Sequence, residues 1–166
     1  MVCAFDSLQV QLEPTLRLLR WDWAGPMHTA GIPAAFERLL AYSQQYQVRR
    51  WLADVSNLPL VNTDEQAWLS ETWLPRFKAL PIRTLALVLP INLHNQLVVE
   101  ALLVEGRPQP RANVQFFSDI PAALDWLTPS ALVAGRMENE WQQALPEWDN
   151  RHASRSGTPQ AAMMNP

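Results

Sequence analysis

Apolar and polar residues alternate in two short runs near the start of the chain. Leu8, Val10 and Leu12 alternate with polar residues, and a Glu-Pro-Thr turn at 13–15 precedes a second alternating run. Successive side chains of a strand point to opposite faces, so an apolar residue at every second position is typical of a strand with one buried face. The pattern therefore predicts an antiparallel β-hairpin. On its second strand, one face carries Leu19, Trp21 and Trp23, and the other carries Leu16, Leu18, Arg20 and Asp22.

The following stretch changes to helical spacing and predicts two helices separated by a strand. A stripe of apolar residues begins at Ile32 and Phe36 and runs to about residue 47. The apolar run 50–55 is typical of a strand that is buried on both faces. A second helix starts at Asn62 or Thr63, either of which can cap it, and a capping box with the glutamine at 66 is expected. Its core-facing stripe is Gln66, Leu69, Trp73, Phe77 and Leu80.

Strands and helices continue to alternate up to residue 127. Residues 82–90 and 113–117 predict strands, and a helix with an apolar stripe at Leu93, Leu97, Ala101 and Leu102 lies between them. A short helix follows, capped by Ser118 or Asp119. Such alternation indicates a parallel sheet. The predicted fold is α/β, a five-stranded mixed sheet of an N-terminal antiparallel hairpin plus parallel strands, with about four helices.

The chain divides into one domain and two C-terminal segments. Residues 1–128 hold all the strands and helices above and form a single α/β domain. Val133, Met137, Trp141 and Leu145 are spaced by four, which predicts an extra helix within 129–149. Residues 150–166 are small and polar and are expected to form a disordered tail.

Composition narrows the classes of function. The chain has 166 residues, is 48% hydrophobic, and carries a net charge of -3 without a clustered basic face, so a nucleic-acid partner is not expected. Cys3 is the only cysteine, there is no secretory signal, and no apolar run has the length of a membrane span. These features predict a cytoplasmic protein. The histidines are scattered and the glycines isolated, so neither a metal nor another cofactor is expected.

Five segments carry a resemblance to a known domain: WDWAG (21–25), RWLADVSNL (50–58), ETWLPR (71–76), RTLALVLP (83–90) and FFSDIPAALDWL (116–127). They resemble the STAS domain of sulfate transporters and anti-sigma-factor antagonists, and in particular small bacterial proteins of that fold, distantly similar to CRAL-TRIO lipid-binding domains. The resemblance implies a STAS-like fold, and in antagonists a serine phosphorylated by a partner kinase at the start of a helix. In the matching region, 61–65, Thr63 is the only hydroxyl.

Polar side chains follow the predicted parallel strands at their carboxyl ends, where open sheets tend to bind ligands. A serine, a histidine and an aspartate at this edge also raise the possibility of a hydrolase, with Ser56 as nucleophile and His94 as base. No Gly-x-Ser-x-Gly turn surrounds Ser56, and hydrogen bonds to loop backbone and helix caps are the simpler interpretation. The candidate ligand or partner edge is Asp54, Ser56, Asn57, Thr63, His94 and Asp119.

The chain has eight tryptophans, of which Trp51 and Trp73 are expected in the core. On a helical wheel with about 100° per residue, Trp68 lies roughly 130° from the centre of the predicted core stripe. Leu74 is also off this stripe, and Pro75 interrupts the helix. Trp126 and Trp141 raise the same question near the C-terminus. An apolar residue off the core face packs under a loop or contacts a partner, so these four predict a symmetric homodimer.

Three functions are compatible with these patterns. The first is a non-catalytic protein-interaction or regulatory module, homodimeric and with an unknown protein partner. The second is a domain that binds a small apolar ligand or lipid in a cleft lined by Trp21 and Trp23. The third is the hydrolase with Ser56 and His94.

Overall fold

A computed structural model describes residues 1–5, 7–25, 31–105 and 112–155. In this part of the chain six strands form one mixed sheet with the order β1-β2-β3-β4-β5-β6. β1, β2 and β3 pair antiparallel, and β3 to β6 pair parallel. The strands are β1 (Val2–Phe5), β2 (Leu8–Glu13), β3 (Leu18–Trp23), β4 (Arg50–Asp54), β5 (Thr84–Val88) and β6 (Asn113–Phe117).

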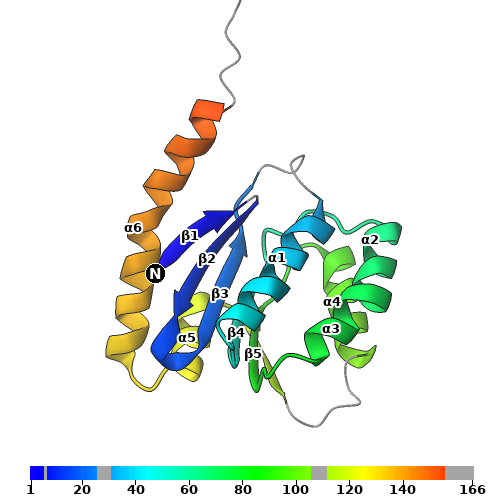
Figure 1. Ribbon diagram of the computed structural model, residues 1–166, viewed down its shortest axis with the longest axis horizontal. Helices are drawn as coiled ribbons and strands as arrows, with labels where there is room; N and C mark the ends of the chain where they lie inside the picture. The colour runs from blue at the N-terminus through cyan, green and yellow to red at the C-terminus, as the bar shows by residue number, and fades with distance from the viewer. Residues whose placement is uncertain (6, 26–30, 106–111, 156–166) are drawn as a thin grey trace, which may run out of the picture.

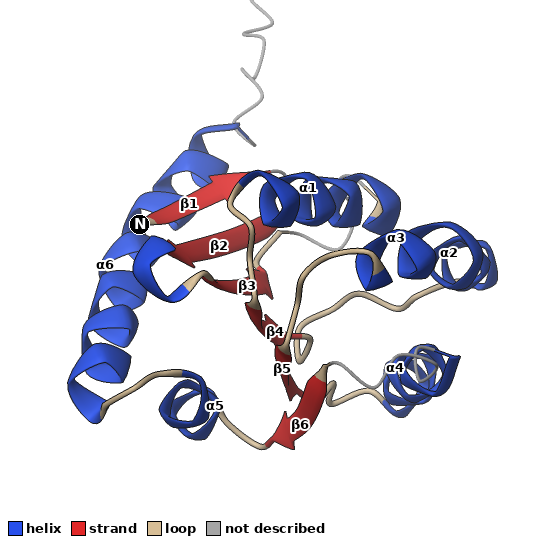
Figure 2. Cartoon of the chain, turned by 60° about the horizontal axis from the view of Figure 1, so that its bottom comes forward, coloured by secondary structure: helices blue, strands red, loops and turns tan. Residues whose placement is uncertain are grey.

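The helices cover both faces of this sheet (Figures 1 and 2). One face carries α1 (Ile32–Gln45), the consecutive turns α2 (Thr63–Trp68), η2 (Leu69–Trp73) and α3 (Leu74–Lys78), and α4 (Leu93–Glu105). The other face carries α5 (Ile120–Leu127) and α6 (Ala131–Arg155). A single turn of 3-10 helix, η1 (Pro14–Leu16), closes the hairpin between β2 and β3.

The predicted α/β class and mixed sheet are confirmed, but the described residues form six strands rather than five. The additional strand is β1, which pairs with β2 along its whole length. Its four residues, Val-Cys-Ala-Phe, are too few to show a period of two. The described helices number five when α2, η2 and α3 are counted as one.

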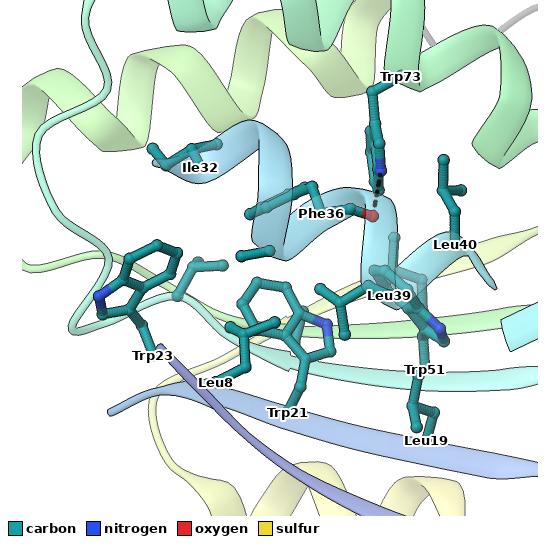
Figure 3. Close-up of a cluster of buried hydrophobic side chains, with 14 of the residues drawn as sticks. Leu8, Leu19, Trp21, Trp23, Ile32, Phe36, Leu39, Leu40, Trp51 and Trp73 are labelled. Carbon is teal, nitrogen blue, oxygen red and sulfur yellow. Dashed lines mark hydrogen bonds between the residues drawn. The ribbon is translucent and has the colours of Figure 1, made fainter. Parts of the chain in front are cut away.

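An aromatic core fills the space between β3, β4 and the helices α1 to α3 (Figure 3). The ring of Trp21 meets the rings of Phe36 and Trp51 edge to face, with centroids 5.5 and 5.9 Å apart. The indole nitrogens of Trp51 and Trp73 donate to Ser43 Oγ and to the carbonyl oxygen of Phe36. These hydrogen bonds satisfy polar atoms that would otherwise be costly to bury.

A π-helical turn in the second helix turns an additional side chain towards the core. The backbone N–H of Leu74 donates to the carbonyl of Leu69, five residues earlier, directly before Pro75. Since proline cannot donate and clashes with the preceding turn, the wider turn accommodates it. The inserted residue shifts the helical phase, so both Trp73 and Leu74 are buried.

The face covered by α6 contains a polar layer. Arg20 is only 3% exposed, and its guanidinium donates to Glu138 at 2.7 Å and lies 4.0 Å from the ring centre of Trp141. The amide nitrogen of Gln11 donates to the backbone carbonyl of Met137. Side-chain hydrogen bonds therefore hold α6 on β2 and β3. The helix continues through residues 150–155, which the sequence assigns to the tail; residues 156–166 are outside the described part.

The orientation of α4 differs from the sequence prediction. Leu93 and Leu97, expected on its core stripe, are 69% and 56% exposed, whereas Asn95 and Val98 are buried. The helix is apolar on nearly every side, so its hydrophobic pattern does not define which face is buried.

Candidate functional site

The predicted edge residues form separate local contacts at the carboxyl ends of the strands. Asp54 ends β4, and one of its oxygens accepts hydrogen bonds from the backbone N–H and the hydroxyl of Ser56, the latter at 2.6 Å. The side-chain amide of Asn57 hydrogen-bonds to Asp22 at the end of β3. Asp54 and Ser56 thus shape the loop after β4, and the serine hydroxyl already has an acceptor.

His94 does not complete a catalytic arrangement with this serine. Its Nε2 atom lies 2.8 Å from the carbonyl oxygen of Val61. The neighbouring Asn95 is fully buried, and its side chain accepts from the backbone N–H of Val61 and donates to the carbonyls of Leu58 and Pro59. Both side chains fasten the loop between β4 and α2. Sequence reasoning missed Asn95, which has no signal beyond being a polar residue in an apolar helix.

Thr63 and Asp119 occupy helix starts. Thr63 is the first residue of α2, and the capping box is formed by Asn62 and Glu65, so the predicted box of Thr63 with the glutamine at 66 is wrong. Asp119 caps α5 and accepts from the backbone N–H of Ala122 at 2.9 Å. The six edge residues therefore have separate local roles.

Two carboxyl groups lie side by side at this edge. Asp22 and Asp54 are register partners on parallel strands, so they point to the same face. Burial raises the pKa of Asp22 to about 7, and the adjacent charge of Asp54 adds to the increase, while the hydrogen bond from Asn57 opposes it. One proton on Asp22 relieves the repulsion between the two groups near neutral pH.

The four predicted self-association residues do not form one patch. Leu74 is buried by the π-helical turn, and Trp141 is buried beneath Arg20. Trp68 packs partly against the aromatic core, and Trp126 packs against Phe117 on the opposite face of the sheet. These side chains therefore make contacts within their own chain.

A cleft of about 800 Å³ opens at the other end of the sheet, near the amino ends of β4, β5 and β6. None of the six predicted edge residues lines it. The amino-terminal part of α4 is held by buried Asn95 and Val98, whereas Leu102 and Leu103, further along, are only partly buried. The cleft lies beneath this second half of α4. Its apolar walls are Leu74, Phe77, Leu80, Leu85, Leu102 and Leu103.

Three cationic side chains line the same cleft. Arg49 precedes β4, Arg83 precedes β5, and Lys78 ends α3. The Nε atom of Arg49 is buried and has no hydrogen-bond partner among the described residues. The backbone carbonyl of Arg49 accepts from the N–H groups of Arg83 and Thr84, which holds the two arginines next to each other just before adjacent strands.

A smaller apolar cavity of about 90 Å³ extends from the cleft towards the aromatic core. It shares Leu74, Phe77 and Leu85 with the larger space and is also lined by Trp21. Trp23, which the sequence also assigned to a ligand cleft, does not line either space. The two spaces together resemble ligand pockets, which are mostly apolar with a few polar groups.

Other types of site are not evident in the described residues. No three His, Cys, Asp or Glu side chains there are grouped as a metal ion would require. Within the same residues, a helix of sufficient length and apolar character to cross the bilayer is not found, in agreement with the sequence.

Comparisons with known proteins give no relative, since no family model, curated protein or solved structure matches this chain. The resemblance to STAS domains therefore remains a prediction.

Proposed function

We propose that this protein is a non-catalytic binding protein whose ligand is a small apolar molecule with an anionic group. The observation that carries this proposal is the 800 Å³ cleft with leucine and phenylalanine walls and three cationic side chains. Its volume falls in the range of about 300–1,000 Å³ typical of small-molecule sites. A medium-chain carboxylate is the simplest ligand with both properties.

The ligand's two parts would have different partners. Burial of an alkyl chain contributes about 0.8 kcal/mol per methylene, and the walls of the cleft supply apolar surface for it. The guanidinium groups of Arg49 and Arg83, whose side chains line the cleft, would donate to a carboxylate, because charged donors prefer anionic acceptors. The hydrolase alternative has less support, since Ser56 and His94 bond to Asp54 and Val61 respectively.

Isothermal titration with decanoate and with 1-decanol tests this proposal. The wild-type protein is expected to bind both and to prefer decanoate about five- to tenfold, because a partly exposed ion pair contributes about 1 kcal/mol. Arg83→Gln should remove most of this preference, and Leu103→Phe should weaken both ligands by filling the cleft. Arg38→Gln, at an exposed position of α1, is the matched control.

Two outcomes would refute the proposal. One is the absence of binding of either compound by folded protein. The other is a preference for decanoate that persists in Arg83→Gln, which would locate the anion elsewhere.

A further inference from the structure

The two edge strands of the sheet differ in what lies beside them. β1 is in contact with α6, which lies alongside it (Figure 2). β6, at the opposite edge, pairs with β5 on one side and with no described strand on the other. Edge strands of natural proteins usually carry charge or proline that prevents pairing with another chain. β6 has the sequence Asn-Val-Gln-Phe-Phe and contains neither.

Apolar side chains are exposed beside this edge. Leu93, Leu97 and Val104 on α4 are 69%, 56% and 62% exposed and lie within about 40° of one another on the helix. Phe116 on β6 is 48% exposed. Its register partner Leu87 belongs to the core beneath α4, so the phenylalanine projects from the same face of the sheet that α4 covers.

We propose that β6 and α4 form a self-association surface, and that the occupant is a second copy of this chain. Two β6 strands that pair antiparallel across a twofold axis would extend the sheet from one copy into the other. Because the axis is perpendicular to the sheet, it would bring both α4 helices to the same side. The exposed side chains of α4 and Phe116 would then be covered in both copies.

The hydrogen-bond pattern of β6 defines the register. The N–H of Asn113 donates to the carbonyl of Arg83, next to β5, so alternate residues 113, 115 and 117 direct their backbone groups inwards. Val114 and Phe116 then direct theirs outwards. Pairing centred on Gln115 places Val114 opposite Phe116 of the second copy and leaves two Gln115 residues facing each other without hydrogen bonds, with Cα atoms about 4.5 Å apart.

The buried area is compatible with a stable dimer. Leu93, Leu97, Val104 and Phe116, with Ile91 just before α4, each expose on the order of 100 Å² of apolar surface. Their total is about 500 Å² per partner, and the paired strands add to it towards the roughly 800 Å² of a standard interface. Glu100 lies in the same stripe and gives the interface a polar element, as most interfaces have.

The molar mass in solution is the first test. Light scattering should give twice the chain mass of 18.9 kDa for wild type and the single mass for Leu97→Glu and for Phe116→Lys. Circular dichroism should show that both variants are folded, since the replaced side chains are exposed. Leu132→Glu is the matched control, because this leucine is 87% exposed on α6, away from β6, and the variant should stay dimeric.

A cysteine in the strand tests the register directly. In a Cys3→Ser background, Gln115→Cys should form a disulfide-linked dimer under mild oxidation, because facing cysteines at this distance can be bridged. Asn113→Cys should not form one, since its counterpart would be residue 117 of the second copy. A monomeric wild type, or a dimer that persists in both Leu97→Glu and Phe116→Lys, would overturn the proposal.

Discussion

Both faces of the sheet bury apolar side chains, but the face beneath α6 adds buried polar side chains to them. Beneath α1 to α4, the sheet contributes Leu19, Trp21 and Trp51 to an aromatic core. Beneath α6, β2 and β3 present Gln11 and Arg20, which hydrogen-bond to the backbone carbonyl of Met137 and to Glu138 of the helix. The comparison indicates that the first face provides most of the apolar stabilisation, whereas the second specifies where α6 lies.

Removal of a core indole should have the largest effect. Trp51→Ala eliminates ring contacts with Trp21, Trp73 and Phe77 and leaves the Ser43 hydroxyl without its donor. The expected loss is about 3–5 kcal/mol of unfolding free energy, measured by urea denaturation. Trp51→Phe should lose clearly less. Similar losses for the two variants would contradict the importance assigned to the indole.

On the face beneath α6, the loss of unfolding free energy on substitution of Arg20 should depend on the residue that replaces it. Arg20→Ala removes the cationic partner of Glu138, which keeps only the hydrogen bond from Gln142, and removes the cation from above Trp141. About 2 kcal/mol of unfolding free energy should therefore be lost. Arg20→Met also removes the cation but keeps an apolar chain packed against Trp141, so it should lose less unfolding free energy than Arg20→Ala. Equal costs in denaturation experiments would show that the charge itself stabilises this face.

A smaller effect on stability is expected from Asp22 and Asp54, the carboxyl pair on the same face of the sheet as Arg20. The pKa of Asp22 is raised from its ordinary value of 3.8 to about 7, so the folded chain holds this proton where the unfolded chain does not. The free energy of unfolding that this bound proton contributes is fully present below about pH 4 and is lost as the pH rises through 7. Asp22→Asn should flatten this dependence and be about 1–2 kcal/mol more stable than wild type at high pH, after allowance for solvent screening.

Denaturant midpoints from pH 4 to pH 8 measure this difference. Asp125→Asn, at an exposed position of α5, is the control and should keep the slope of wild type. If the Asp22→Asn profile runs parallel to that of wild type, Asp22 does not titrate in this range and the argument from its burial beside Asp54 fails.

Residue patterns predict much of this fold. Alternation in β2 and β3 identifies the hairpin and the faces of Leu19, Trp21 and Trp23, and helical spacing identifies α1. β1 could not be identified because four residues show no clear period. The faces of α4 could not be assigned either, because apolar residues surround that helix.

The site was harder to predict than the fold. The edge residues Asp54 and His94 have the types that chemistry requires, but each bonds to a neighbour in a loop. The inward position of Leu74 depends on a π-helical turn, which a regular helical wheel cannot represent. The cleft arises from the spacing between α3 and α4, and the residues that line it come from segments far apart in the chain.

We propose above all that the ligand binds on the aromatic face of the sheet, which α1 to α4 cover, and not on the face beneath α6. Hydrogen exchange with and without decanoate tests it most directly. We expect added protection in α3 and in the second half of α4, and unchanged exchange in α6. Protection gained in α6, or saturated binding without any change at α3 and α4, would contradict the claim.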